Sequence, residues 1–391
     1  MTFKHFRLLA PLLLTLAATA LASTTWYVNG VTGSDTNNCL SPTVACKTIG
    51  HAISLASSGD TIRVAAATYA ENLTIGISLS ILGAGASTTI IDGGGIDRVA
   101  FTSGPHVTIS NVTIQNGDGG IANAATLVLN NTIVTGNHVH VRCSHLHCGA
   151  SGAGIYNTGT LTINNSTVSS NSIRSPVPSG SAVLGGGIYN GGRVVISRST
   201  INNNGGGCPV CAWFGAGVYN DVGAALTLTN ATLSGNDAQG GGSYGGAINN
   251  QDGKTLTMNN STISGNNAAK GGGVYGGGTL QNSIVANNTG GNCYYAMISN
   301  GYNLSSDATC DFSGPGDMNN TDPMLGPLQN NGGPTQTMAL QEGSPAIDAG
   351  NPAGCTDSHG HLLKTDQRGF PRPDKEDTGG CDIGAYELSH Q

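Results

Sequence analysis

The residues with the most potential chemistry lie near the middle of the 391-residue chain. Four histidines and two cysteines fall within eleven residues there: His138, His140, Cys143, His145, His147 and Cys148. Imidazole and thiolate are ligands that zinc takes in tetrahedral sites, so the four histidines are candidate metal ligands. The alternative is a loop closed by a disulfide, with solvated histidines. An oxidising compartment favours that alternative, because an oxidised cysteine cannot bind a metal.

The ten cysteines fall as neighbours in five pairs: Cys39 and Cys46, Cys143 and Cys148, Cys208 and Cys211, Cys293 and Cys310, and Cys355 and Cys381. An even count in an exported chain predicts disulfides, and we expect nearest-neighbour pairing that closes five local loops. No thioredoxin-like pattern surrounds the Cys208–Cys211 motif, so a structural disulfide is expected there. A zinc site with four thiolates from the second and third pairs is the alternative.

Four tyrosines follow glycine-rich blocks, each next to an Ile or Val: Tyr156, Tyr189, Tyr219 and Tyr275. We expect them to line up on an outer face. They are candidate ligand-binding residues, a platform for sugar rings. The other interpretation is an aromatic stack that only stabilises the sheet, since cross-strand aromatic pairs do so without a ligand.

Acidic residues that could act in catalysis are scattered. Glycoside hydrolysis needs two carboxylates across the scissile bond. Polysaccharide lyases with a β-helix use Ca²⁺ held by clustered carboxylates and a basic residue that removes a proton. No Asp-Asp pair occurs in the chain. The most noticeable charges lie near the C-terminus: Asp348, Asp366, Arg368, Asp382 and Glu387. They predict either a calcium site or a buried network of ion pairs; apart from this calcium, no cofactor is expected.

These residues must be positioned by a repeated structure. An Ile or Val after a glycine-rich block recurs at positions 121, 155, 188, 218, 248 and 274, in steps of 34, 33, 30, 30 and 26 residues. Each block is followed by an alternating segment such as LTINNSTVSSN at 161–171. Period-two alternation broken by turns indicates short strands, and a repeat of this size indicates a solenoid. The sequence therefore predicts an all-β fold, a right-handed parallel β-helix with coils about 4.8 Å apart.

Two further features follow from the repeat. Segments of variable length lie at equivalent places, at 138–151, 172–184, 205–214, 237–244 and 267–270, so stacking puts them all on one side. Asparagines recur in two columns: Asn157, Asn190, Asn220 and Asn250 in one, and Asn137, Asn171, Asn204, Asn236, Asn266 and Asn288 in the other. Asn tolerates left-handed backbone and can hydrogen-bond its copy in the next coil, so both columns are expected to be structural ladders.

Both ends of the chain differ from the repeats. Residues 1–22 have a basic start, an apolar run and a small-residue cleavage site, the layout of a signal peptide, and no later apolar run predicts a transmembrane helix. A short helix within 47–55 would cover the first coil. Residues 311–391 hold 12 acids and 4 bases, a net charge of −8, whereas the whole chain has a formal charge of −7. We expect this segment to cap the last coil. We therefore divide the chain into a signal peptide (1–22), a β-helix (23–310) and a C-terminal domain (311–391).

Four ordered motifs in the last segment carry a family resemblance: DPMLGPLQNNGGPTQTMAL at 322–340, GSPAIDAG at 343–350, DQRGFPRP at 366–373 and CDIGAYEL at 381–388. This segment resembles the choice-of-anchor Q domain of bacterial surface proteins. The N-terminal part is similar to pectate-lyase-like β-helix proteins, and the Gly-Gly-x-Ile blocks resemble the repeats of polymorphic outer-membrane proteins. The resemblance implies export to the cell surface; since three residues follow the last motif, we expect secretion or periplasmic residence over anchoring.

Composition narrows the function. Only 9% of the residues are charged and the net charge is −7, and no basic patch suited to nucleic acid is visible. We predict an exported monomer without catalysis that acts in adhesion or binds a glycan or another extracellular ligand. The alternative is a polysaccharide lyase or glycoside hydrolase. Carboxylates clustered beside an Arg or Lys in a groove would favour the enzyme, and an uncharged face would favour the binding protein.

Overall fold

A computed structural model of the chain describes residues 23–140, 142–144, 147–174, 182–206, 212–240, 242–253, 255–374 and 380–389. The predicted signal peptide, His145, Cys208 and Cys211 lie outside these residues. For residues 142–144, 147 and 148 the structure describes the backbone alone.

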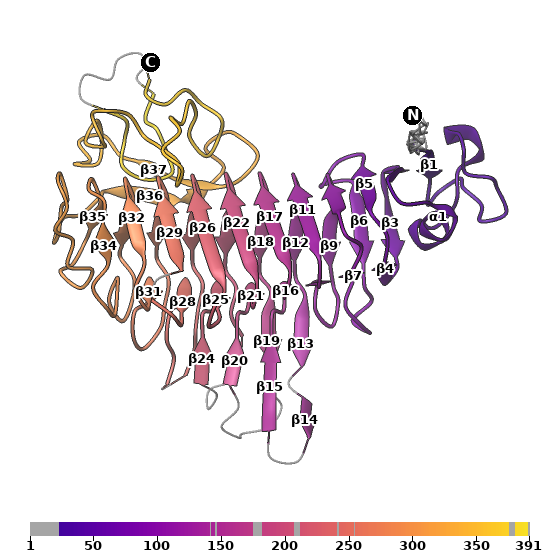
Figure 1. Ribbon diagram of the computed structural model, residues 1–391, viewed down its shortest axis with the longest axis horizontal. Coiled ribbons are helices and arrows are strands. Elements are labelled where there is room, and N and C mark those ends of the chain that lie inside the picture. The colour runs from indigo at the N-terminus through magenta and orange to yellow at the C-terminus, as the bar shows by residue number, and fades with distance from the viewer. Residues whose placement is uncertain are drawn as a thin grey trace, which may run out of the picture.

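Three parallel sheets of 11, 10 and 8 strands wind around one axis, shown horizontally in Figure 1. Sheet A has β1 (Thr25–Val28), β2 (Asp60–Val64), β5 (Leu79–Gly83), β8 (Val107–Ser110), β11 (Thr126–Asn130), β17 (Thr160–Asn164), β22 (Arg193–Ser197), β26 (Ala225–Thr229), β29 (Leu256–Asn259), β32 (Thr279–Gln281) and β34 (Ile298–Ser299). Sheet B has β3 (Ala67–Ala70), β6 (Thr89–Asp92), β9 (Thr113–Gln115), β12 (Ile133–Thr135), β18 (Thr167–Ser169), β23 (Thr200–Asn202), β27 (Thr232–Ser234), β30 (Thr262–Ser264), β33 (Ile284–Ala286) and β35 (Leu304–Ser305). Sheet C has β4 (Leu73–Ile75), β7 (Ala100–Thr102), β10 (Ile121–Asn123), β16 (Ile155–Asn157), β21 (Ile188–Asn190), β25 (Val218–Asn220), β28 (Ile248–Asn250) and β31 (Val274–Tyr275).

Equivalent repeat positions pair directly in this arrangement. Ile155 lies opposite Ile188, which lies opposite Val218, and the tyrosines beside them pair in the same register. The inward residues of every coil are apolar and fully buried, so one continuous core runs along the axis. The predicted right-handed parallel β-helix is confirmed.

Both predicted asparagine ladders are present. In sheet C, each amide Nδ2 donates to the Oδ1 of the next copy at 2.7–2.9 Å, from Asn123 through to Asn250. At the end of sheet B, the same contact runs from Asn137 to Asn288 at 2.9–3.0 Å. All of these side chains are buried, so each ladder satisfies its own amides without water.

The N-terminal end is covered as predicted. Helix α1 (Ile49–Leu55) packs Ile49 and Ala52 into the core after a short 3-10 turn, η1 (Pro42–Val44). Thr48 caps it, its hydroxyl accepting from the His51 N–H at 3.2 Å. The carboxylate of Glu71 accepts from the N–H groups of Ile49 and Gly50 at 2.8 and 2.7 Å, which ties the helix to the first coil.

The inserted segments form a second structure beside sheet C, which we call the fin. Its strands are β13 (His138–His140), β14 (Arg142–Ser144), β15 (His147–Ser151), β19 (Ser172–Arg174), β20 (Ala182–Leu184) and β24 (Ala212–Phe214). They pair coil to coil, mostly in parallel, and project from the lower side of the solenoid in Figure 1. Trp213 and Ile173 are fully buried in a small separate core there. The insertions thus extend the rungs of the solenoid.

The C-terminal segment covers the last coil only with its first residues. Phe312 still packs into the main core and Met318 pairs with Leu304, so the chain closes the last coil with residues 311–318. The remainder, with β36 (Leu325–Gln329) and β37 (Thr337–Leu340), lies along the side of the solenoid opposite the fin (Figure 1). Apolar side chains of this part, among them Leu340 and Ile383, pack on Ile284 of sheet B, because outward residues of the last coils are apolar.

Three of the five predicted disulfides fall on cysteines whose side chains the structure describes, and all three are confirmed: Cys39–Cys46, Cys293–Cys310 and Cys355–Cys381. Cys143 and Cys148 lie opposite each other across the antiparallel pair β14–β15, and their side chains lie outside the description. Disulfides form in oxidising compartments, which supports an extracytoplasmic location. Among the described residues, no helix is long and apolar enough to span a membrane.

Candidate functional site

A continuous tract of aromatic rings runs along the corner between sheet C and the fin. It contains all four predicted tyrosines and four further rings, and its members in order are Tyr156, Tyr189, Tyr219, Phe214, Tyr244, Tyr275, Tyr294 and Tyr295. Phe214 and Tyr244 come from the inserted segments, and Tyr294 and Tyr295 follow Cys293. Sequence reasoning missed these four, because they lie outside the repeated motif that carries the others.

The first three rings form a stacked column. Tyr156 and Tyr189 lie 4.8 Å apart between centroids with planes 6° apart, and Tyr189 and Tyr219 lie 5.7 Å apart. Tyr189, the inner ring, therefore has both faces covered by its neighbours. At the open end, the guanidinium of Arg98 lies 5.6 Å from the Tyr156 centroid. Tyr156 and Tyr189 are half-buried, and Tyr219 is buried.

Asp221 ties the column to the turn beside it. The Tyr189 hydroxyl donates to Asp221 Oδ2 at 2.6 Å, and the Tyr219 hydroxyl donates to Oδ1 at 3.4 Å. Burial and this carboxylate raise the pKa of Tyr189 and raise the pKa of Tyr219 to about 12. Both phenols stay neutral hydrogen-bond donors across the physiological range.

The other end of the tract is open. Tyr275 stacks on Tyr294 at 5.1 Å, and the Tyr295 ring stands edge-to-face against both at 5.4 and 4.9 Å. Tyr294 is 41% exposed and Tyr295 is 50% exposed. Lys270 joins them, its Nζ 4.9 Å from the Tyr294 centroid and 3.3 Å from the Tyr294 hydroxyl. We call Tyr244, Lys270, Tyr275, Tyr294 and Tyr295 the aromatic cluster.

Hydrogen bonds within the aromatic cluster raise the pKa values of two of its residues. The Tyr275 and Tyr295 hydroxyls lie 3.5 Å apart, and this contact together with burial raises the pKa of Tyr275 to about 12. The hydrogen bond to Tyr294 raises the pKa of Lys270. At neutral pH the cluster therefore offers phenol donors, exposed ring surface and one cation.

A groove lies at the opposite end of the tract, where the fin begins. Its volume is about 670 Å³, and Tyr156, Arg98, Asp118 and His140 are among its lining residues. Arg98 donates to the carbonyls of Gly152 and Ser151 at 3.0 and 3.2 Å, so its guanidinium is used to join sheet C to the fin. Asp118 is the one carboxylate among the described lining residues of this groove.

The predicted histidine ligands do not converge where the structure describes them. His138 and His140 lie on β13; His138 Nδ1 is 2.7 Å from Ser172 Oγ, and His140 Nδ1 is 3.8 Å from Asp118 Oδ1. Burial, with the charges of Arg174 and His140, lowers the pKa of His138. Of His147, in β15, the structure describes the backbone alone, and His145 lies outside the described residues. The predicted metal site therefore stays a prediction.

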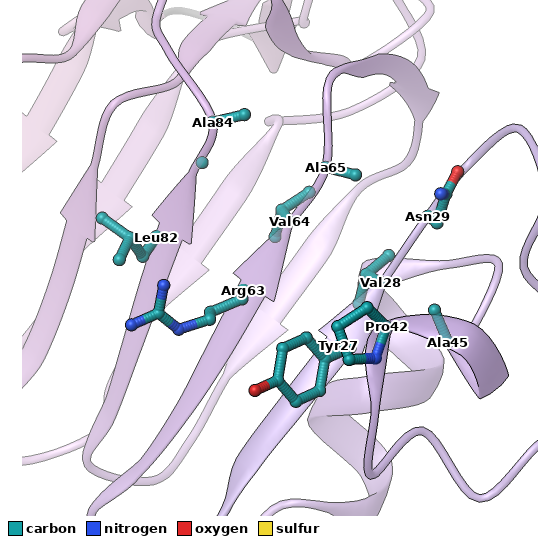
Figure 2. A pocket seen from close by; sticks show the side chains of 11 residues that line it. Tyr27, Val28, Asn29, Pro42, Ala45, Arg63, Val64, Ala65, Leu82 and Ala84 are labelled. Atoms are coloured by element: carbon teal, nitrogen blue, oxygen red, sulfur yellow. The ribbon is translucent and has the colours of Figure 1, made fainter.

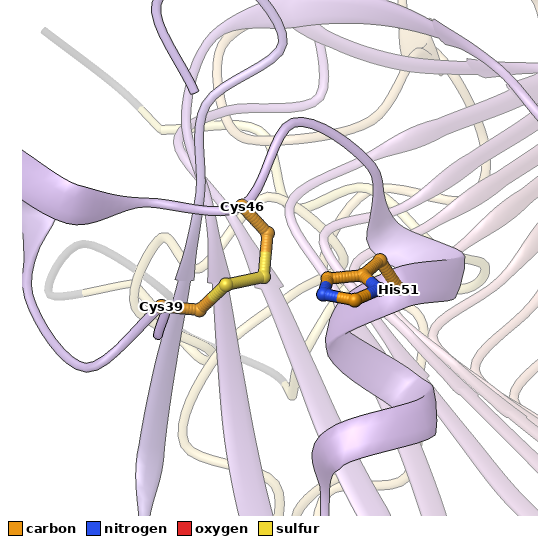
Figure 3. Close-up of side chains that lie close together, drawn as sticks. All are labelled: Cys39, Cys46 and His51. Carbon is orange, nitrogen blue, oxygen red and sulfur yellow. A yellow bond between two sulfur atoms is a disulfide. The ribbon is translucent and has the colours of Figure 1, made fainter. Parts of the chain in front are cut away.

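Two other groups of potential metal ligands do converge among the described residues. The first is Cys39, Cys46 and His51 at the N-terminal end, where the two sulfurs are bonded to each other beside the imidazole (Figure 3). Disulfide sulfurs are not metal ligands, so this group is structural. The adjacent pocket of about 240 Å³ is lined mainly by small or apolar residues such as Val28, Ala45 and Val64, with Arg63 at its side (Figure 2).

The second group is Asp357, His359 and His361 in the C-terminal segment. Asp357 and His359 line a pocket of about 370 Å³ together with Arg193 and Arg198 from the outer side of sheet A. Burial would raise the pKa of Asp357, but hydrogen bonds from the N–H groups of His361 and His359 hold it below its ordinary value. No spacing pattern in the sequence could have joined residues more than 150 positions apart.

Of the five charged residues predicted for a calcium site, Asp366, Arg368 and Glu387 are engaged in ion pairs. Arg368 Nε lies 2.7 Å from Asp366 Oδ2, and Arg372 Nε lies 2.6 Å from Glu387 Oε2, all four side chains being buried. The Asp382 carboxylate accepts from the Leu388 N–H at 2.6 Å.

Asp348 is tied to the same network through its backbone, since its N–H donates to the Asp382 carboxylate at 2.9 Å. Burial raises the pKa of Asp382. Among the described residues these carboxylates do not converge on a common ligand position, and the contacts match the ion-pair interpretation.

No protein-family model and no curated protein sequence matches the chain. Among solved structures, the chain is similar to pectate lyase Pel9A (TM-score 0.44, 14% identity, 95% of this chain and 98% of that chain). It is also similar to XylC in complex with xylose (0.43, 10%, 94% and 99%) and to a pectin methylesterase from carrot (0.40, 13%, 78% and 91%). Likeness at this level reaches no further than the parallel β-helix that the strand pairing already shows. The choice-of-anchor Q resemblance stays a prediction.

Proposed function

We propose that this protein is an exported, non-catalytic glycan-binding protein and that the aromatic cluster is its binding surface. One observation carries the proposal: Tyr294 and Tyr295 expose two-fifths and half of their surface in a group of four rings with one lysine. Tyrosines combine a large apolar face with a polar hydroxyl, which makes them frequent anchors at binding surfaces. A sugar presents the complementary combination of C–H faces and hydroxyls.

The aromatic cluster is a better platform than the predicted column of Tyr156, Tyr189 and Tyr219. A sugar ring stacks on the face of an aromatic ring. In the column, neighbouring rings cover both faces of Tyr189, and Arg98 lies over the Tyr156 ring. Tyr295 stands edge-to-face against its neighbours, which leaves ring surface accessible. Of the four predicted tyrosines, Tyr275 is therefore the one that contributes to the proposed surface.

The length of the solenoid and the place of the aromatic cluster near its C-terminal end support a role in adhesion. The solenoid is long and rigid, with stacked ladders and a continuous core, and the aromatic cluster lies near its C-terminal end. An elongated scaffold with a binding surface near one end can hold that surface away from the other end. Three disulfides suit a protein that works outside the cytoplasm.

The enzyme alternative has one supporting observation, the pocket with Asp357, Arg193 and Arg198. It has a carboxylate beside basic residues, as a lyase or hydrolase would need. Paired-carboxylate hydrolysis requires a second carboxyl group, and Asp357 is the single carboxylate among the described residues that line this pocket. The binding protein is therefore the conclusion that we favour.

Binding to a panel of polysaccharides, with and without Ca²⁺, tests the proposal. We expect at least one glycan to bind and Tyr295→Ala to weaken that binding about tenfold, a loss of about 1.4 kcal/mol. Phe101→Ala is the matched control, because Phe101 is 43% exposed on sheet C away from the cluster, and it should leave binding unchanged. Release of unsaturated or reducing ends by the wild type would establish the enzyme instead.

A further inference from the structure

We propose that Asp357, His359 and His361 bind a divalent transition-metal ion, zinc by their ligand chemistry. This site is separate from the aromatic cluster and from the histidines of the fin. It goes beyond the proposed glycan binding, because it would hold with or without a glycan. The donor set is one carboxylate and two imidazoles, a combination that zinc takes in three-ligand sites. Calcium prefers oxygen donors alone, so two imidazoles disfavour it.

The potential ligand atoms already lie near one another. One atom from each of the three side chains falls within 4.8 Å of the others, and Asp357 Oδ2 lies 3.2 Å from His361 Nδ1. The two imidazole rings lie 6.0 Å apart between centroids, with planes 25° apart. Bonds of about 2.0–2.2 Å to zinc bring ligand atoms to roughly 3.5 Å from one another. Rotation of the two exposed histidine side chains would close that difference without a change of backbone.

The backbone beneath the ligands is a tight hairpin. Asp357 N–H donates to the His361 carbonyl at 2.9 Å, and Leu363 N–H donates to the Cys355 carbonyl at 2.8 Å. Asp357 Oδ1 accepts from the N–H groups of His359 and His361 at 2.8 and 2.9 Å. This leaves Oδ2 on the side of the imidazoles. The hairpin thus sets the spacing of all three ligands.

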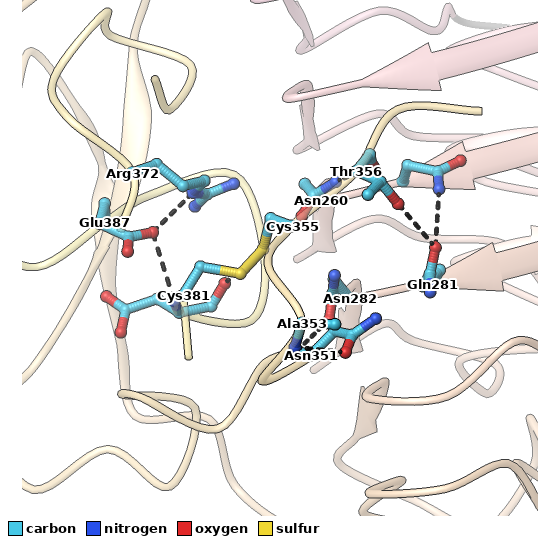
Figure 4. Close-up of a disulfide and its surroundings, with 12 residues drawn as sticks. Asn260, Gln281, Asn282, Asn351, Ala353, Cys355, Thr356, Arg372, Cys381 and Glu387 are labelled. Carbon is cyan, nitrogen blue, oxygen red and sulfur yellow. Dashed lines mark hydrogen bonds and ion pairs between the residues drawn. A yellow bond between two sulfur atoms is a disulfide. The ribbon is translucent and has the colours of Figure 1, made fainter. Parts of the chain in front are cut away.

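The hairpin is fastened to the solenoid. The Cys355–Cys381 disulfide joins the base of the hairpin to the segment around residue 381, and Asn260 Nδ2 donates to the Thr356 carbonyl at 2.7 Å. The Thr356 hydroxyl lies 3.3 Å from Gln281 Oε1 (Figure 4). Ligands held on a rigid support lose little conformational entropy when a metal binds, which favours a defined site.

The site opens on the pocket that Asp357 and His359 share with Arg193 and Arg198. Three protein ligands leave a coordination position for water or for an anion. Both arginines are exposed on the outer side of sheet A, so an anion on the metal would have guanidinium donors in the same pocket. The pocket therefore fits a small anionic ligand, such as a carboxylate, bridging metal and arginine.

Metal titration of the full-length exported protein, without a histidine tag and stripped by a chelator, tests the proposal. We expect calorimetry with zinc chloride to give one equivalent, and cobalt chloride to give a visible absorption band from imidazole ligation. His359→Ala combined with His361→Ala should weaken zinc binding by about 100-fold or more and abolish the cobalt band. Calcium chloride should give no binding at this site.

The fin supplies the matched control. His138→Ala combined with His140→Ala removes the same number of imidazoles and should leave the zinc stoichiometry and the cobalt band unchanged. Thermal melting and peptide mapping of Cys355–Cys381 should show that both double variants are folded. The proposal is overturned if zinc fails to bind at one equivalent, if the 359/361 variant binds it as the wild type does, or if the 138/140 variant loses it.

Discussion

The fin and the C-terminal segment are two additions to the same solenoid, built in opposite ways. Each strand of the fin continues a coil and pairs through its backbone with the equivalent strand of the next coil, as Val183 pairs with Trp213. The fin therefore contacts the solenoid coil by coil, and its stability comes from neighbours one repeat away.

The C-terminal segment instead crosses four coils. It contacts a column of turn residues with left-handed backbone, Arg198, Asn230, Asn260 and Asn282. Thr335 donates to the Arg198 carbonyl at 3.2 Å, and Asn230 donates to the Thr365 carbonyl at 2.8 Å. Arg372 reaches Asn230 Oδ1 at 2.9 Å from its buried pair with Glu387.

Because of this difference, a substitution should destabilise the two regions to a different extent. A fin strand that is damaged disturbs its two neighbours, because its contacts are repeated pairings. The C-terminal segment depends on a few unrepeated side chains, so the loss of one buried charge should release a large part of it. Substitutions in the two regions test this contrast.

Arg372→Met should destabilise the C-terminal segment most. It leaves the Glu387 carboxylate buried without its guanidinium, which typically costs about 3–5 kcal/mol. Hydrogen exchange should show loss of protection across β36, β37 and residues 381–388. Lys364→Met is the matched control, because Lys364 is exposed and the charge change is the same. Equal stability of the two variants would show that the segment does not rest on this pair.

Trp213→Ala should destabilise the fin by about 3 kcal/mol, the lower part of the range for such truncations, because the edge of the fin can relax into the cavity. Trp213 is fully buried in the small core of the fin. Hydrogen exchange should rise in β20 and β24 and stay unchanged in sheet A. Phe101→Ala serves again as the control for an exposed aromatic. Loss of protection throughout the solenoid would contradict the coil-by-coil description.

Alkali should weaken the corner between sheet C and the fin. The pKa of Tyr219 and that of Tyr275 are raised to about 12, whereas an unfolded tyrosine has a pKa of about 10. Between pH 10 and 12 the unfolded chain loses these protons and the folded chain keeps them, so the free energy of unfolding falls as pH rises. Below pH 10 this contribution is fully present.

Urea unfolding at several pH values, followed by tyrosinate absorbance, measures this dependence. Tyr219→Phe combined with Tyr275→Phe should make the fall shallower, because these two residues then ionise in neither state, whereas Tyr189, whose pKa is also raised, keeps its share. The same change at Tyr27 and Tyr302, outside the tract, should leave it as in the wild type. An equally steep fall in the 219/275 variant would contradict the assignment.

Arg198→Asn should give the smallest effect, a stabilisation of about 0.5–1 kcal/mol. Arg198 has a φ of 49° in a column whose equivalent positions are Asn165, Asn230 and Asn260. Asn tolerates this left-handed backbone at lower cost than Arg. Chemical denaturation measures the gain, and Arg193→Asn, on the adjacent strand, is the control for the lost charge. A loss of stability specific to the 198 variant would show that the guanidinium itself stabilises the C-terminal segment.

Much of the fold could be predicted from the sequence because repeat contacts join identical positions one period apart. Asn157 and Asn190 bond to each other since the coil brings each asparagine under its copy, and Tyr156 stacks on Tyr189 for the same reason. The three described disulfides follow sequence neighbours. The candidate site was harder, because Tyr294, Tyr295 and Lys270 belong to no repeated motif.

The repeat pattern and the segment before it predicted the parallel β-helix, both asparagine ladders and the helix at the first coil. Three features became visible only in the folded chain. The C-terminal segment lies along the side of the solenoid, and Asp357 shares a pocket with Arg193. Ring faces are covered in one part of the aromatic tract and open in another. The two groups of features differ in how far apart in the sequence the contacting residues are. A periodic pattern specifies neighbours at one fixed separation, whereas an unrepeated segment is placed by burial and ion pairs with residues more than 100 positions away, which no local pattern encodes.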